Sequence, residues 1–250
     1  MDDWSGYLTD FHTRRPGIAD AVLSRCTSGN HTPYRWLARG VSQTATRVLD
    51  VRCGAGAMGR ELAAEGRTVI GLDRNAAELA AAHGPGPFVR CDALAMPFAD
   101  GSFDAVVSTL GLAQIHPTSG LLDEVSRVLR PGGVFVGLVP TIRPLNARDM
   151  RTAARLTQVL LGTPRFPATV ELAVGKLLEQ HGLRKAEDAR ERYHFTVEDR
   201  EDADLLLSGL YLPTTSPKRL QAASDWLTQQ AAEHDGIRVP IPLRRVVAIK

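Results

Sequence analysis

The sequence is poor in cysteine and in long apolar runs, and each shortage excludes a class of protein. Its three cysteines, Cys26, Cys53 and Cys91, are odd in number and widely spaced, which predicts neither a disulfide framework nor a metal-ligand pair. We therefore expect a reducing, cytoplasmic location and no metal. No stretch approaches the roughly 20 apolar residues of a membrane span, and the acidic N-terminus lacks the apolar segment of a signal peptide.

Charge of one sign is not concentrated anywhere in the chain. The 30 Lys and Arg residues are balanced by 28 Asp and Glu residues, and no basic run alternates with aromatic residues. Nucleic acid and membranes are therefore not expected as partners. At 250 residues with 44% apolar residues, the chain is long enough for one α/β domain over 1–250. No sequence pattern specifies an oligomeric state.

Residues 46–139 alternate short β-rich runs with helical stretches, which is typical of βαβ units and a parallel sheet. Strands are predicted at 46–51, 68–72, 103–108 and 134–139, with a weaker one at 87–90, and helices at 58–65, 76–83 and 120–129. Two closing strands are predicted at 193–197 and 244–249. Residues 1–40, 140–175 and 198–240 are predicted to form a helical cover. The expected fold is a Rossmann-like, seven-stranded, mostly parallel sheet with helices on both faces.

A glycine-rich loop follows the first predicted strand. It reads Arg52-Cys53-Gly54-Ala55-Gly56-Ala57-Met58-Gly59, and its glycines allow a sharp turn and a close approach of the backbone to a ligand. The spacing also fits the GxGxxG pattern of dinucleotide-binding proteins, with Asp73 about 20 residues further on. A nicotinamide-dependent oxidoreductase is therefore an alternative.

Carboxylates around this loop favour a different ligand. Asp50 ends the first strand, where its charge suits a cationic amine and repels a pyrophosphate. Asp92 follows the 87–90 strand at the same edge of the sheet, where ligands bind in such folds. A long segment from Cys91 to Asp104, followed by Arg130-Pro131-Gly132-Gly133, completes the pattern.

These pieces, in this order and spacing, resemble the class I S-adenosylmethionine-dependent methyltransferases, in particular the ubiquinone and menaquinone C-methyltransferases. The resemblance covers about 46–139. It implies a methyl transfer from S-adenosylmethionine to a small molecule, with S-adenosylhomocysteine as the product. It places Asp73 at the ribose hydroxyls, Arg74 beside the adenine, and Asp92 with the Ala93 backbone at the adenine amino group. The other cofactor-binding residues that it implies are Asp50, Arg52, Cys53, Gly54, Gly56, Thr109 and Leu110.

The sequence departs from the family pattern at Arg52, where relatives have glycine. If this position needs a left-handed backbone, a non-glycine residue adds about 1–2 kcal/mol of strain. If the backbone is ordinary, Arg52 pairs with Asp50 or with the cofactor carboxylate. Relatives also carry a His pair where this chain has Ala113 and Gln114. Arg52 motivates a second alternative, a methyltransferase-like binding module or cyclase that has lost transfer chemistry.

Catalytic residues leave a weaker signal, because the sulfonium already activates the methyl group. His116 is the candidate general base for an acceptor hydroxyl. His12 and His31 lie in the predicted N-terminal cover, where a position facing the pocket is an alternative, and surface or capping positions are more typical of both. Leu160, Leu161, Leu206, Leu210 and Tyr211 predict a partly hydrophobic acceptor between the sheet edge and the cover, and they are equally compatible with the core.

Overall fold

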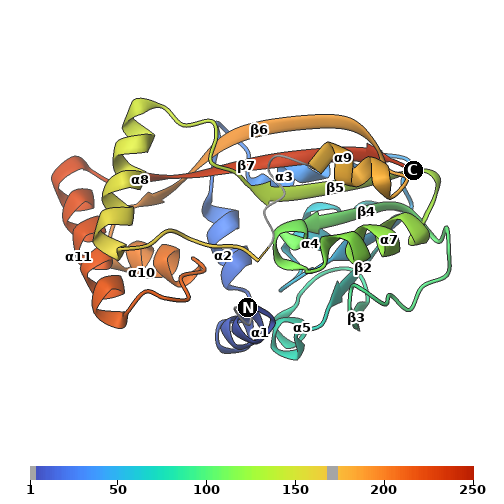
Figure 1. The fold of residues 1–250 in the computed structure, drawn as a ribbon, viewed down its shortest axis with the longest axis horizontal. Coiled ribbons are helices and arrows are strands. Elements are labelled where there is room, and N and C mark those ends of the chain that lie inside the picture. The colour runs from blue at the N-terminus through green and yellow to red at the C-terminus, as the bar shows by residue number, and fades with distance from the viewer. Residues whose placement is uncertain (1–3, 168–173) are drawn as a thin grey trace.

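The computed structural model describes residues 4–167 and 174–250, which form a single sheet flanked by helices (Figure 1). Residues 1–3 and 168–173, which belong to the predicted cover segments 1–40 and 140–175, lie outside the described residues. The strands are β1 (Arg47–Val51), β2 (Thr68–Asp73), β3 (Phe88–Arg90), β4 (Phe103–Thr109), β5 (Leu129–Pro140), β6 (Arg184–Val197) and β7 (Ile237–Ile249). The helices of the described part are α1 (Trp4–Arg14), α2 (Ile18–Arg25), α3 (Pro33–Ala38), α4 (Ala57–Glu61), α5 (Ala76–Ala81), α6 (Gly111–Gln114), α7 (Thr118–Val128), α8 (Ala147–Leu160), α9 (Val174–Gln180), α10 (Arg200–Ser208) and α11 (Pro217–His234).

The seven strands follow the order β3-β2-β1-β4-β5-β7-β6. Strands β1 to β5 pair in parallel, and β7 runs antiparallel to both of its neighbours. The predicted fold class is therefore confirmed. The strand order reverses between β1 and β4, and in open α/β sheets ligands bind beyond the carboxyl ends of the strands at such a point.

The central strands are buried on both faces, which explains their nearly continuous apolar sequence. Successive residues point to opposite sides, so Val48 and Ala105 belong to the cluster with α2 and α3. Their neighbours Leu49 and Val106 belong to the cluster with α7. Two apolar layers thus pack against the two faces of the sheet. Polar residues lie at the ends of the strands, at the edge where a ligand is expected.

The closing strands are longer than the sequence predicts. Strand β6 begins at residue 184 instead of 193, and β7 begins at 237 instead of 244, so residues 237–240 are strand and their assignment to the helical segment 198–240 is wrong. The two strands pair from Val197 opposite Ile237 to Arg184 opposite Ile249. Charged residues at 184–192 conceal the strand in the sequence, although edge strands commonly carry such charge.

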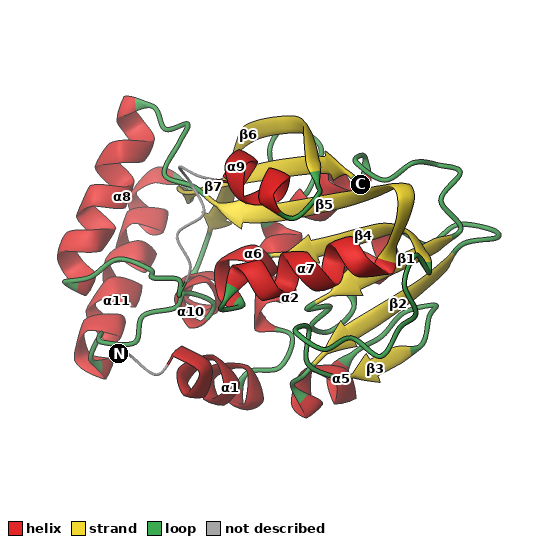
Figure 2. Cartoon of the chain, turned by 45° about the vertical axis from the view of Figure 1, so that its right-hand side comes forward, coloured by secondary structure: helices red, strands yellow, loops and turns green. Residues whose placement is uncertain are grey.

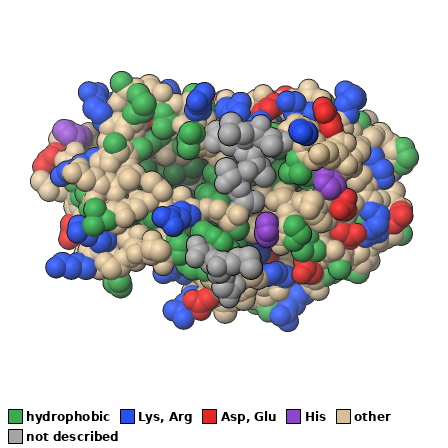
Figure 3. Space-filling view, in the orientation of Figure 1, with side chains coloured by type: hydrophobic (Ala, Val, Ile, Leu, Met, Phe, Trp, Pro, Cys, Tyr) green, Lys and Arg blue, Asp and Glu red, His purple; other side chains and the backbone are tan. Residues whose placement is uncertain are grey.

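The long β6–β7 pair reaches from the sheet to a group formed by α8, α10 and α11, and α1 packs beside α5 (Figure 1, Figure 2). Basic and acidic side chains are interspersed over the face drawn in Figure 3. In the described part of the chain, no helix combines the length and the apolar character that crossing a membrane requires.

Candidate functional site

The loop after β1 has a left-handed backbone at every second residue. The φ angles of Arg52, Gly54 and Gly56 are 64°, 53° and 88°. At Gly56 an added Cβ would come within 2.6 Å of the His83 carbonyl oxygen, so both conformation and space require glycine there. The loop is therefore a tight turn that brings its backbone against the segment following α5.

Two carboxylates accept hydrogen bonds from the backbone of this turn. The Gly54 N–H donates to Asp73 Oδ2 at 3.2 Å, and the Ala57 N–H donates to Asp20 Oδ2 at 3.1 Å. In a dinucleotide-binding protein, amides at this position bind the pyrophosphate. Because protein carboxylates hold them here, the turn does not present the anion site that a nicotinamide cofactor needs.

A cavity lies against the turn, at the carboxyl ends of β1 and β4. We call it the first cavity. The acidic side chains Asp20, Asp50, Asp73 and Glu78 line it, and the other residues around it are His12, Ala19, Tyr34, Arg52, Cys53, Gly54, Met58, Thr109, Leu110 and Gln114. This strongly acidic lining favours a cationic ligand or one rich in hydrogen-bond donors.

Asp50 is the most unusual group in the first cavity. Its side chain is buried, and neither carboxylate oxygen has a hydrogen-bond partner among the described residues. Burial, followed by the charges of Asp20 and Asp73, raises the pKa of Asp50 well above its ordinary value. The Thr109 hydroxyl is also buried with no partner in the described part. Such polar groups normally have partners, so their position on a cavity wall indicates a ligand site.

A second cavity contains the residues that the resemblance places at the adenine. It is lined by Arg74, Asp92, Ala93 and His116, together with Trp4, Ser5, Leu8, Leu72, Cys91, Leu94, Ile115, Pro167, Arg52 and Gln114. The candidate base His116 is exposed and precedes a cis peptide bond to Pro117. The structure thus places His116 with the proposed adenine contacts and not in the cavity that holds Asp50.

Arg52 and Gln114 line both cavities and therefore lie between them. Arg52 Nη2 and Nε donate to Gln114 Oε1 at 2.6 and 3.1 Å, and Nη1 lies 3.7 Å from Asp73 Oδ1. The left-handed alternative for Arg52 is the one observed. The pairing with Asp50, expected for an ordinary backbone, is not found among the described residues, because the turn directs the guanidinium toward β2 and α6.

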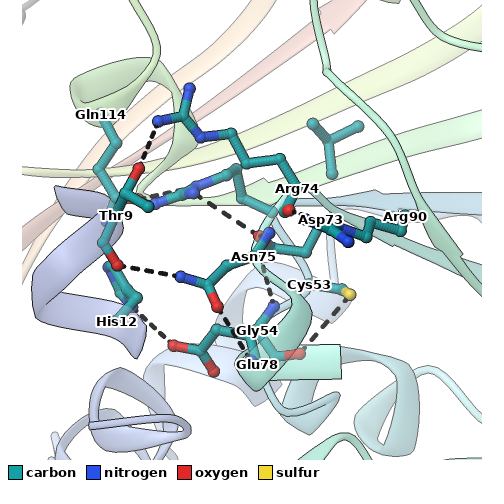
Figure 4. Close-up of polar contacts among 12 residues, drawn as sticks. Thr9, His12, Cys53, Gly54, Asp73, Arg74, Asn75, Glu78, Arg90 and Gln114 are labelled. Atoms are coloured by element: carbon teal, nitrogen blue, oxygen red, sulfur yellow. Dashed lines mark hydrogen bonds and ion pairs between the residues drawn. The ribbon is translucent and has the colours of Figure 1, made fainter. Parts of the chain in front are cut away.

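Helix α1 covers the site and is held by the β2–α5 segment through polar contacts (Figure 4). The Arg74 side chain donates to Thr9 Oγ1 at 2.7 Å, the Asn75 amide donates to the Thr9 carbonyl at 3.2 Å, and His12 Nδ1 lies 2.6 Å from Glu78 Oε1. Arg74, expected beside the adenine, thus uses its guanidinium to hold α1, although its side chain also lines the second cavity.

A directed chain of hydrogen bonds links Arg52 to α1. Because a guanidinium only donates, the Gln114 oxygen must face Arg52, and the Gln114 amide then donates to Tyr211 Oη at 2.8 Å. Tyr211 Oη lies 2.9 Å from His12 Nε2, and His12 Nδ1 lies 2.6 Å from Glu78 Oε1. The turn, the cover and α5 therefore share one polar network.

His12 is only 5% exposed and lines the first cavity, so the less favoured expectation, a position facing the pocket, is the one observed. Sequence reasoning missed other residues of the site. Asp20, Glu78 and Gln114 line the first cavity, yet each belongs to a helix whose local pattern carries no sign of the distant β1 turn. Glu78 alone had a signal in the sequence, because it is an acidic residue in the helix that directly follows the Asp73 strand.

The remaining candidates are structural. Burial raises the pKa of the Cys53 thiol, with nearby carboxylates adding to the effect, and burial raises that of Cys91 to about 11, so both thiols stay protonated. Leu160 and Leu206 belong to the core, whereas Leu161 is 68% exposed. No cluster of metal-ligating side chains occurs within residues 4–167 and 174–250.

Sheet order and the position of the turn define a Rossmann-like methyltransferase fold. Residues 49–137 match the family described as "Methyltransferase domain", which supports the predicted resemblance to the class I methyltransferases. It is similar to demethylmenaquinone methyltransferase of Beutenbergia cavernae, at 42% identity over 93 residues, which are 36% of this chain and 39% of that protein. Sterol 24-C-methyltransferase of Yarrowia lipolytica is 33% identical over 140 residues, covering 52% of this chain and 36% of that protein. The chain thus spans well under two thirds of these relatives.

Two solved structures share the fold over nearly the whole chain. One is a putative methyltransferase of Bacillus halodurans, with a TM-score of 0.60 and 19% identity, covering 87% of this chain and 98% of the other. The second is the [4+2]-cyclase SpnF, with a TM-score of 0.63 and 18% identity, covering 98% and 94% of the two chains. At these identities the similarity establishes the fold alone.

Proposed function

We propose that this chain transfers a methyl group from S-adenosylmethionine to a small-molecule acceptor and releases S-adenosylhomocysteine. The observation that carries the proposal is Asp50, a buried carboxyl with no hydrogen-bond partner among the described residues, on the wall of an acidic cavity beside the turn of a methyltransferase domain. A sulfonium compound with an amino group is a ligand that such a cavity favours.

The residues present fit this cofactor. In the proposal, Asp73 accepts the ribose hydroxyls, Asp92 and Ala93 hold the adenine in the second cavity, and Asp50 with Thr109 faces the amino-acid portion in the first. Cys53, Gly54, Gly56 and Leu110 supply backbone around it. The buried and unpartnered oxygens of Asp50 and Thr109 support this arrangement. Arg52 is the residue that must move, because it lies between the two cavities.

The cofactor supplies a methyl group that is already activated by the sulfonium. The protein's own contribution is to hold the acceptor in line and to exclude water, and orientation of this kind lowers a barrier by several kcal/mol, up to about 7–11 kcal/mol in favourable systems. We propose that residues 46–139 bind the cofactor, and that 1–40, 140–175 and 198–240 shape a partly hydrophobic acceptor site. His116 remains the candidate base for an acceptor hydroxyl.

Calorimetric titration with S-adenosylhomocysteine tests the proposal without knowledge of the acceptor. Asp73→Ala should weaken binding by more than tenfold, since a charged hydrogen-bond partner contributes about 1.5–3 kcal/mol. Asp100→Asn is a matched control, because its side chain is 80% exposed and lines neither cavity. An unchanged dissociation constant for Asp73→Ala would remove the ribose assignment. Absence of binding by the unaltered protein would remove the transferase proposal.

A methyltransferase-like protein without transfer chemistry is the second candidate, and the position of Arg52 between the cavities favours it. Transfer of a labelled methyl group to a panel of hydrophobic acceptors would separate the two candidates. The nicotinamide alternative is disfavoured by the acidic first cavity. A thermal shift with NADH that exceeds the shift with S-adenosylhomocysteine would reverse this order.

A further inference from the structure

The Arg52 guanidinium occupies the approach to the carboxylate that is proposed to hold the ribose. Its Nη1 atom lies 3.7 Å from Asp73 Oδ1, and its side chain is only 10% exposed. The same side chain borders both cavities, with Gln114 as its partner. A ligand that extends from Asp92 in the second cavity to Asp50 in the first must pass the point where this pair lies.

We infer that Arg52 is an internal competitor for the nucleoside site: its guanidinium takes the place of ligand hydroxyls at Asp73, and a nucleoside must displace it to bind. The inference rests on the proposed cofactor site and concerns what determines its affinity. The ligand class that Arg52 opposes is a nucleoside with both ribose hydroxyls.

Electrostatics explain why the guanidinium stays in this place when no ligand is bound. Four acidic side chains line the first cavity, and Arg52 is the one arginine or lysine among the lining residues that the structure describes. Removing it would leave Asp73 with hydrogen bonds from the backbone N–H groups of Gly54 and Asn75, and without an ion pair to any other described residue. Arg52 is thus the counter-ion that the chain itself supplies to this site.

The geometry also explains why the guanidinium can leave. Its contact with Asp73 is longer than a hydrogen bond, and its short contacts are to Gln114, which carries no charge. Both contacts come from a single side chain on a loop, so a change of its rotamers frees Asp73 without moving a strand. Ligand hydroxyls can then donate to the carboxylate directly.

Calorimetry with Arg52→Ala and Arg52→Met tests the competition. Arg52→Ala should bind S-adenosylhomocysteine at least fivefold more tightly than the unaltered protein. Arg52→Met keeps a long side chain without its charge and donors, and it should fall between the two. Circular dichroism establishes that each variant is folded.

Two further measurements locate the competition at the ribose. Adenosine should gain affinity from Arg52→Ala, whereas 2′,3′-dideoxyadenosine should gain at most twofold, because it has no hydroxyls to place at Asp73. In an Asp73→Ala background, Arg52→Ala should also bring little gain, since the contested carboxylate is absent.

The outcomes separate this inference from the proposed function. If the unaltered protein binds S-adenosylhomocysteine and Arg52→Ala binds it equally or more weakly, Arg52 is not a competitor, and the cofactor proposal stands. An equal gain for adenosine and its dideoxy analogue also overturns the inference, because the obstruction is then steric and not at the ribose. If neither protein nor variant binds the ligand, the proposed function fails together with the inference.

Discussion

The backbone at Arg52 should be strained, and the pair Arg52→Gly and Arg52→Ala measures that strain. Both variants lose the hydrogen bonds to Gln114 equally, so this loss cancels in the comparison. At a φ of 64°, a non-glycine residue costs about 1–2 kcal/mol. Glycine in turn costs about 0.4–1 kcal/mol through the greater freedom of the unfolded chain. The middle values of these two ranges predict that the glycine variant is more stable than the alanine variant by about 0.8 kcal/mol.

Equilibrium unfolding in urea, without ligand, measures this difference. Arg155 provides the control, because it is exposed in the middle of α8, where the backbone is helical. There the order should reverse, with alanine more stable than glycine by about 1 kcal/mol. If the alanine variant at position 52 is as stable as the glycine variant while the control behaves as expected, the reasoning from the left-handed backbone is refuted.

Three further predictions concern charge and packing. Arg244 donates to both oxygens of Asp188 at 2.7 and 2.6 Å and holds the Asp188 pKa at about 2. Asp188→Asn should lower the free energy of unfolding by about 1–2 kcal/mol at pH 7. A carboxyl with a lowered pKa stabilises the fold only at pH values above its pKa in the unfolded chain, so the difference between variant and unaltered protein should vanish as pH falls from about 4 to 2. A stability difference that does not depend on pH would contradict the ion pair as its cause. The pKa of Asp50 is raised, so ionisation of Asp50 favours the unfolded chain as pH rises above about 4. Asp50→Asn should therefore stabilise the ligand-free protein increasingly over this range, while weakening cofactor binding. Urea unfolding at pH 5 and pH 8 that gives the same difference in unfolding free energy between the variant and the unaltered protein would contradict this prediction. Gly71→Ala would bring a Cβ within 2.6 Å of a Phe88 ring atom, which should cost about 1–3 kcal/mol, and an unchanged melting temperature would show that β3 yields instead.

Local sequence patterns determined much of the architecture. Alternation of β-rich runs with helical stretches located the central strands to within a residue or two at most ends, because each pattern depends only on neighbours along the chain. Strand β5 is the exception, since it begins at Leu129 and not at 134. The helix predicted at 58–65 ends at Glu61, since a short helix is decided by its caps and packing more than by composition.

Tertiary structure alone decided how the site is assembled. The spacing of the glycines indicated the turn, and Asp50 and Asp73 at strand ends indicated the edge where a ligand binds. The carboxylate of Asp20, the contact of His12 with Glu78 and the lengths of β6 and β7 come from segments distant in sequence. Such pairings depend on which surfaces the folded chain brings together, and no local pattern encodes them.

Arg52 shows the division most clearly. The sequence by itself determined that an arginine stands where relatives have glycine, and it left two conformations open. Only the folded chain decided between them, because hydrogen bonding of the turn to β2 sets its φ angle, and α6 places Gln114 within reach of the guanidinium. The physical reason is that a backbone angle is a local choice made under constraints imposed by distant strands and helices.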